Sequence, residues 1–211
     1  MGKFRKDLEC LLEKLSSSFG REVTENIKRL KDVLVDLNRK RLVKINHSAM
    51  ELICAAELLR KGYGVEVEYP LERNLLCDLY GWKGDGSLIV EVETGFVPPD
   101  HALDPVTYRK ARIISKIVRY SNYATKFGLA SPPYYIMDIP EVFIKPPRYR
   151  DKREVEEVKA LCDLYYRNPP VSVEEILNSR LHAIFIVNVD DVTAKEVDPV
   201  TYLEKASKLT F

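Results

Sequence analysis

The sequence predicts an α/β protein with a mixed central sheet, flanked by helices and preceded by a helical hairpin. Two observations lead to this prediction. Segments with helical and with strand periodicity alternate along the chain, and three short strand-like segments follow one another between two helices. The chain has 211 residues, of which 45% are hydrophobic, which suffices for one sizeable core.

The first part of the chain, residues 1–44, is expected to be a helical hairpin beside an α/β domain at 45–211. Apolar residues recur at helical spacing in 4–19 and again in 21–40, and Gly20 separates the two runs. Each run makes one apolar seam. The spacing leaves open whether these seams pack on the rest of the chain or on a second copy of it.

The core motif is expected between residues 47 and 139, in the order helix, strand, strand, strand, helix, strand. The expected segments are a helix at 47–61, strands at 65–69, 75–80 and 88–93, a helix at 106–127 and a strand at 134–139. Three strands joined by turns make a meander, and a helix that crosses to the fourth strand makes the sheet mixed. The later segments are helices at 151–167 and 172–179, a strand at 181–189 and a short helix after Asp198-Pro199.

Composition excludes several classes of protein. The formal net charge is +1, from 33 basic and 32 acidic residues, so overall charge does not decide for or against a nucleic-acid partner. No apolar run approaches the roughly 18 residues of a membrane span, and we expect a soluble, cytoplasmic protein. The four cysteines form no CxxC pair, which argues against a zinc knuckle, while a Cys10–Cys162 disulfide stays open.

Three acidic residues on two neighbouring predicted strands are the candidate catalytic residues. A hairpin centred near Gly84 places Asp78 nearly opposite Glu91, and Glu91 and Glu93 share one face of their strand. The apolar residues around them indicate buried strands. Ionised carboxylates near a core must be paired or must hold a metal, and hard cations prefer carboxylate oxygens.

These residues resemble the PD-(D/E)xK nuclease superfamily, and especially archaeal Holliday-junction resolvases, over residues 47–139. The resemblance rests on the order of elements together with Asp78 and the run Glu91-Val92-Glu93. It implies a restriction-endonuclease-like fold and a metal-dependent endonuclease that cleaves DNA, with Mg²⁺ or Mn²⁺ as cofactor, and often a homodimer. It also implies an acidic metal ligand on the preceding helix, which is Glu51 here, with Glu57 as the runner-up; the implied metal ligands are Glu51, Asp78 and Glu91.

The sequence departs from this family at one important position. The family usually has Lys where this chain has Glu93. One interpretation is that Glu93 is a general base or an additional metal ligand. Another is that Lys110 or Arg109 on the next helix supplies the positive charge. The alternative is a nuclease fold without catalytic activity that binds DNA or a protein.

Basic residues with interleaved tyrosines follow the acidic motif and are the candidate nucleic-acid contacts. Four of them recur at helical spacing on the helix at 106–127, and others lie in a Pro-rich loop at 145–153. The predicted contacts are Arg109, Lys110, Arg112, Lys116, Arg119, Arg148 and Arg150. His47, one turn before Glu51, is within reach of Glu51 or of a metal, but a helix-start or packing role is favoured.

Overall fold

The computed structural model describes residues 2–72 and 74–208, and these form seven α-helices and one six-stranded sheet. The helices are α1 (Lys3–Ser16), α2 (Arg21–Arg39), α3 (Ile45–Arg60), α4 (Pro105–Tyr120), α5 (Lys152–Asp163), α6 (Val173–Asn178) and α7 (Pro199–Ser207). The strands are β1 (Gly64–Glu72), β2 (Leu75–Lys83), β3 (Gly86–Val92), β4 (Lys126–Ser131), β5 (Ala183–Asn188) and β6 (Thr193–Val197). The α/β class is confirmed.

The sheet is mixed and open, with its strands in chain order from β1 to β6. Strands β1, β2 and β3 form an antiparallel meander, β3, β4 and β5 run parallel, and β6 is antiparallel to β5. The helix α4 makes the crossover from β3 to β4. The order of elements expected between residues 47 and 139 is therefore confirmed, and the pair Leu79–Val90 has the register predicted for a hairpin near Gly84.

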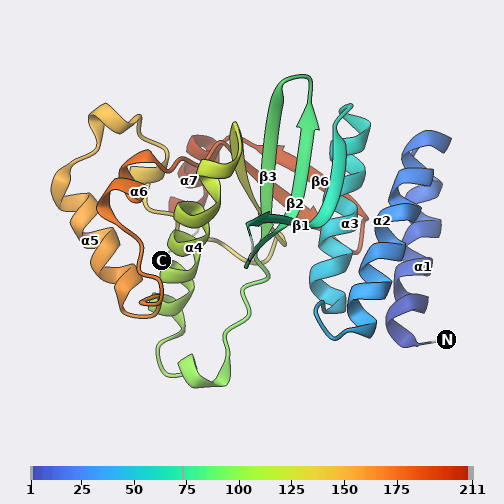
Figure 1. Cartoon of the computed structure of the whole chain (residues 1–211), viewed down its shortest axis with the longest axis horizontal. Helices are drawn as coiled ribbons and strands as arrows, with labels where there is room; N and C mark the ends of the chain where they lie inside the picture. Colours follow the sequence, from blue (N-terminus) through green and yellow to red (C-terminus); the bar gives the residue numbers. More distant parts are fainter. Residues whose placement is uncertain (1, 73, 209–211) are drawn as a thin grey trace.

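Helices cover both faces of the sheet (Figure 1). The first core cluster joins α1, α2 and α3 to side chains such as Val90 and Val92, and the second joins α4, α5 and α6 to side chains such as Ile89 and Phe127. Residues of β3 alternate between the two clusters, as the two-residue period of a strand requires. Glu91 follows the alternation of Ile89 and lies on the α4 side.

The N-terminal helices share their core with the rest of the chain. Leu8 and Leu15 of α1 and Leu30 of α2 are fully buried in one cluster with α3 and the sheet. The apolar seams of residues 4–19 and 21–40 thus pack on this chain. In the described residues, the proposed boundary at residue 44 does not separate two hydrophobic cores.

Three details of the sequence prediction were wrong. The fourth strand lies at Lys126–Ser131 and not at 134–139, and the preceding helix ends at Tyr120 instead of 127. The strand β4 contains small residues, which give a weak strand signal. Gly128 is one of them, and a Cβ at this position would lie 3.0 Å from the Phe185 ring. The edge strand β6 was not predicted. All four cysteines are free, and Cys10 and Cys162 lie in helices on opposite faces of the sheet.

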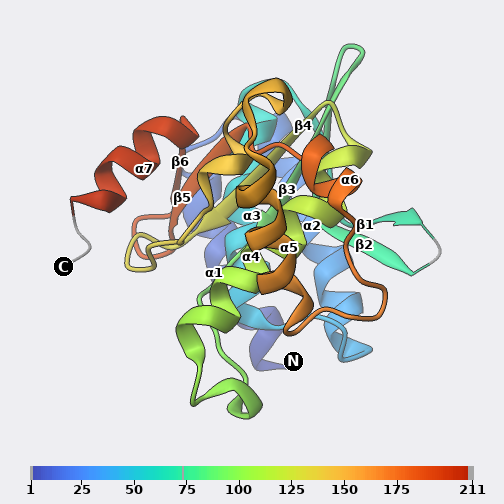
Figure 2. The ribbon, with the colours of Figure 1, turned by 90° about the vertical axis from the view of Figure 1, so that its left-hand side faces the viewer.

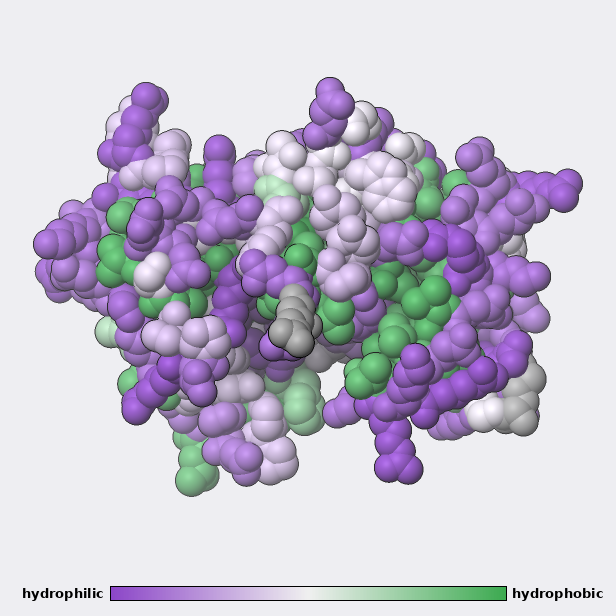
Figure 3. All heavy atoms as spheres, in the orientation of Figure 1, coloured by the Kyte–Doolittle hydropathy of each residue, from purple (hydrophilic) through white to green (hydrophobic). Residues whose placement is uncertain are grey.

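Two surface features complete the fold. The β1–β2 hairpin projects from the body of the molecule beyond the sheet (Figure 2). One face of the molecule is mostly hydrophilic, with hydrophobic side chains gathered over the N-terminal helical layer (Figure 3). In the described part of the chain, no helix is long and apolar enough to cross a membrane.

A candidate metal centre at the fork between β2 and β3

Strands β2 and β3 separate at a fork, and two acidic side chains fill it. The backbone pairing of the two strands ends at Leu79 and Val90. Beyond this pair, the Val92 N–H donates to Oδ2 of Asp78 (2.6 Å), and the Asp78 N–H donates to Oε1 of Glu91 (3.0 Å). Carboxylates thus take the place of backbone carbonyls, and this exchange fixes both of them in the gap between the strands.

Strand β1 is irregular at the level of the fork. Val67 and Tyr69 pair with β2, but Glu68 between them has a φ of 49°. This left-handed conformation is uncommon for a residue other than glycine, and such strain gathers at functional sites. Burial, and then the charge of Asp78, raises the pKa of Glu68 to about 7. Glu68 is therefore a further acidic residue at the edge of the centre.

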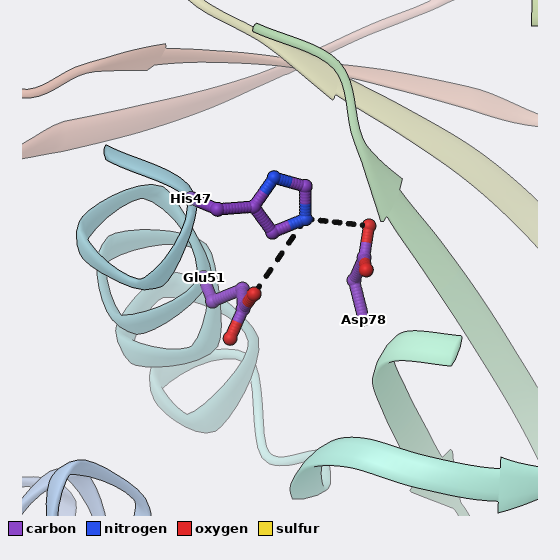
Figure 4. A group of neighbouring side chains, drawn as sticks. All are labelled: His47, Glu51 and Asp78. Carbon is purple, nitrogen blue, oxygen red and sulfur yellow. Dashed lines mark ion pairs between the residues drawn. The ribbon is translucent and has the colours of Figure 1, made fainter. Parts of the chain in front are cut away.

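Helix α3 directs His47 and Glu51 toward the fork (Figure 4). The two residues are four apart, so they lie on one face of the helix. The Nε2 atom of His47 lies 3.0 Å from Oδ2 of Asp78 and 3.6 Å from Oε1 of Glu51. One donor atom from each of these three residues lies within 4.8 Å of the other two, a spacing that a single metal ion can span.

Glu51 is the buried group whose chemistry needs an explanation. Its exposed fraction is 0%, and neither carboxylate oxygen has a hydrogen-bond partner among the described residues. An ionised carboxylate in such a place loses its hydration without compensation, which costs several kcal/mol. The residue must therefore carry a proton or bind a cation.

Helix α4 brings two cations to the opposite side of the fork. The Nζ atom of Lys116 lies 3.1 Å from both Glu91 and Glu93, and it donates to the Val92 carbonyl (2.8 Å). The Nε of Arg112 donates to Oε1 of Glu93 (3.1 Å). Four carboxylates against these two cations leave formal negative charge at the centre, which a divalent cation would neutralise.

The ionisation of the acids reflects this arrangement. Burial, followed by the charge of Asp78, raises the pKa of Glu51 well above its usual range and that of Glu91 to about 8. Burial would also raise the pKa of Asp78, but Lys116 and His47 together lower it. Both acids therefore hold their protons to higher pH than free carboxyl groups do, and a cation that binds would displace these protons.

The structure brings together the four acidic residues that the sequence singles out. Glu51, Asp78, Glu91 and Glu93 all lie around the fork, with Glu93 on the side of Arg112 and Lys116. The runner-up ligand Glu57 lies elsewhere on α3, where it pairs with Arg60 at 2.7 Å.

The predicted nucleic-acid contacts are dispersed. Lys116 and Arg112 point into the centre, and Arg150 is buried, where it donates only to backbone carbonyls. The remaining four lie nearer the surface: Arg109 over Tyr135, Lys110 paired with Asp138 (2.8 Å), Arg119 donating to the Pro169 carbonyl (2.7 Å) and Arg148 over Tyr149.

Sequence reasoning did not place Lys116 or Glu68 at the fork, and it favoured a helix-start or packing role for His47, which lies 3.0 Å from Asp78. Lys116 is one of several basic residues at helical spacing on α4, and this spacing does not say which of them faces the sheet. The signal for His47 was available, since it precedes Glu51 by one helical turn. No sequence signal marks Glu68, whose position depends on an irregularity in β1.

Comparisons of the chain with protein-family models, with curated proteins and with solved structures find no match. The functional proposal therefore depends on the residues and geometry of the fork itself.

Proposed function

We propose that this chain is a metal-dependent DNA endonuclease with a restriction-endonuclease-like core. The observation that carries the proposal is the buried fork, where ligand atoms of His47, Glu51 and Asp78 lie within 4.8 Å of one another and neither oxygen of Glu51 has a hydrogen-bond partner among the described residues. A helix before the meander and a helix after it supply the other groups, in the order expected for such nucleases. Structure-specific cleavage, as in junction resolvases, belongs to the same proposal.

The residues at the fork fit a divalent cation. Glu51, Asp78 and Glu91 would hold it with carboxylate oxygens, which suit Mg²⁺ and Mn²⁺ alike. His47 adds one imidazole nitrogen, a donor that Mn²⁺ accepts more readily than Mg²⁺ does. When bound, the cation would supply Lewis-acid chemistry, acidifying a water and neutralising charge on the phosphate.

Lys116 offers the positive charge that the strand lacks at position 93. Burial would lower its pKa, but Asp78, Glu93 and Glu91 raise it well above the usual range, so the ammonium stays charged at neutral pH. Held between these acids, it stabilises the charge that develops on a phosphate under attack. In this proposal Lys116, and not Lys110 or Arg109, takes that role.

Glu93 is the proposed proton acceptor or additional ligand. Its Oε1 is held by Arg112 and by Lys116, both at 3.1 Å. These contacts keep the carboxylate oriented at the edge of the fork. As a base, Glu93 would take the proton of the attacking water.

A nuclease fold that binds but does not cleave is the second candidate. The observation in its favour is the close packing of Lys116 against Glu91 and Glu93, which already neutralises part of the centre. Such a cluster would hold the fold together without a metal. Binding of a divalent cation at the fork decides between the two candidates.

The test is cleavage of labelled junction, flap, single-stranded and duplex DNA in Mg²⁺, Mn²⁺ and EDTA. We expect metal-dependent cleavage by the parent protein and none by Asp78→Asn. The matched control is Asp85→Asn, because Asp85 lies in the β2–β3 turn away from the fork. Salt-dependent DNA binding without cleavage in any metal would favour the second candidate.

A homodimer is part of the proposal, because cutting both strands is commonly done by two copies. The hydrophobic side chains gathered over the N-terminal layer support it (Figure 3). Light scattering at several concentrations measures the oligomeric state, and a monomer throughout would remove this part of the proposal.

A further inference from the structure

A groove with a volume of about 1190 Å³ lies at the carboxyl ends of the parallel strands. One wall consists of α1 and the start of α3. The other consists of the segments that follow β3 and β4, at 94–96 and 132–134, and of the end of β5 with the turn after it, at 187–190. In open α/β sheets this edge is the usual place for a ligand.

The lining of the groove combines aromatic and basic side chains. The rings of Phe96 and Tyr134 line the groove and are exposed by 57% and 83%. The basic residues of the groove are Lys3, Lys14 and Lys44, and its acidic ones are Asp7 and Asp190. The Nζ atom of Lys44 lies 5.8 Å from the centre of the Phe96 ring.

The groove adjoins the candidate metal centre. The Phe96 carbonyl accepts a hydrogen bond from Arg112 (3.2 Å), and the same guanidinium binds Glu93 at 3.1 Å. On α3, the groove residues Asn46 and Met50 immediately precede His47 and Glu51. A chain lying in the groove would therefore end, or continue, beside the fork.

We propose that this groove holds a single strand of nucleic acid, an inference that rests on the proposed nuclease function. Unpaired bases expose flat faces that stack on aromatic side chains, while lysines contact the phosphates, and this combination is typical of single-strand binding. A duplex hides its base faces and would leave Phe96 and Tyr134 without a role. The volume also exceeds the roughly 300–1,000 Å³ of small-molecule pockets.

The chain carries its own probe for this proposal. Cys10 lines the groove and is exposed, whereas Cys54, Cys77 and Cys162 are fully buried. An alkylating reagent should therefore modify Cys10 selectively in the folded protein. Occupation of the groove would slow this reaction.

The experiment measures the alkylation rate of Cys10 by mass spectrometry in EDTA, with 15-nucleotide single-stranded DNA, the same sequence as RNA, or duplex DNA. Either single strand should slow alkylation about fivefold or more at saturation, and the duplex should not. Tyr134→Ala should raise the strand concentration for half protection about tenfold. The matched control is Trp82→Ala, an aromatic 43% exposed outside the groove, which should change nothing.

Several results would overturn the proposal. These are no protection by either single strand, equal protection by duplex, or an equal loss of protection in the Tyr134 and Trp82 variants. Protection that grows with protein concentration alone would assign the groove to a second copy of the chain. Duplex cleavage with Cys10 unprotected would refute the groove and leave the nuclease standing, whereas protection without cleavage on any substrate would refute the nuclease alone.

Discussion

Arg150 and Glu51 are both buried charged residues, but their surroundings are opposite. The guanidinium of Arg150 donates to four backbone carbonyls, and these belong to Lys145, Ile176, Leu177 and Ser179. The carboxylate of Glu51 is at least as deeply buried, and neither of its oxygens has a hydrogen-bond partner in the described residues.

The difference separates a structural charge from a functional one. Arg150 is satisfied by the chain alone, and it joins the loop after β4 to the end of α6. Glu51 is not satisfied, and its burial is unfavourable unless a proton or a cation compensates. Together with Asp78 and Glu91, it marks the place where we propose that a divalent cation binds.

The largest expected effect is the loss of activity on removal of the central carboxylate. Asp78→Asn removes a proposed metal ligand and should reduce cleavage by about three orders of magnitude or more. The rate is measured under single-turnover conditions in Mn²⁺, with circular dichroism to show that the variant is folded. Cleavage within a few-fold of the parent rate would contradict the assignment of the site.

The variant Arg150→Met tests the other buried charge of the comparison. This variant leaves four carbonyls without their donor and should destabilise the protein by about 3 kcal/mol. Urea denaturation measures the free energy of unfolding. The folded fraction should bind a divalent cation as tightly as the parent, and a weakened cation affinity would mean that Arg150 also serves the metal centre.

Glu51→Gln should have the reverse effect on stability. The amide replaces a buried acid that lacks hydrogen-bond partners, so the free energy of unfolding of the cation-free protein should rise by about 1–3 kcal/mol at pH 8. The affinity for Mn²⁺ should fall at least about tenfold. Urea denaturation in EDTA measures the first effect and calorimetry the second. Destabilisation combined with unchanged Mn²⁺ affinity would identify Glu51 as an ordinary core residue.

The stability of the cation-free protein should also depend on pH, because the acids of the fork ionise. The folded-state pKa of Glu91 is raised to about 8 and that of Glu68 to about 7, so both acids hold their protons more tightly in the folded state than in the unfolded one. Stability of the cation-free protein is then lost as the pH rises from about 5 to 8, by at most about 1.4 kcal/mol per pH unit for each group. The lowered pKa of Asp78 acts in the opposite sense, at more acidic pH.

Denaturation in EDTA at several pH values between 5.5 and 8.5 measures this slope. Saturating Mn²⁺ should remove most of it, and Glu91→Gln should flatten it without metal. Stability that rises over this range in EDTA would contradict the proposed ionisation of the fork.

The meander could be predicted from the sequence because its strands carry clear signals. Alternating apolar residues and the turn at Gly84 give both the strands and their register. The strand β4 lacks such a signal, because it has a glycine at position 128, where the Phe185 ring leaves little room for a side chain. The strand β6 lacks it because it is a mostly exposed edge strand. Both depend on neighbours that are distant in the sequence.

Three of the four acids of the fork were predictable for the same local reason, whereas Glu51 followed only from the family resemblance. Strand period joins Glu91 to Glu93, and hairpin register brings Asp78 beside them. The role of Lys116 was not predictable, because it follows from how α4 lies on the sheet. The basic stripe on this helix looked uniform in sequence, yet packing turned Arg112 and Lys116 inward.

Calorimetric titration of the protein with Mn²⁺ at pH 7.5, in two buffers of different ionisation enthalpy, tests the central claim most directly. Glu51→Gln and Asp78→Asn are titrated alongside. The account predicts one Mn²⁺ bound per chain, release of protons on binding from Glu51 and Glu91, and loss of binding in both variants. Absence of Mn²⁺ binding at millimolar concentration, or binding that neither variant weakens, would contradict it.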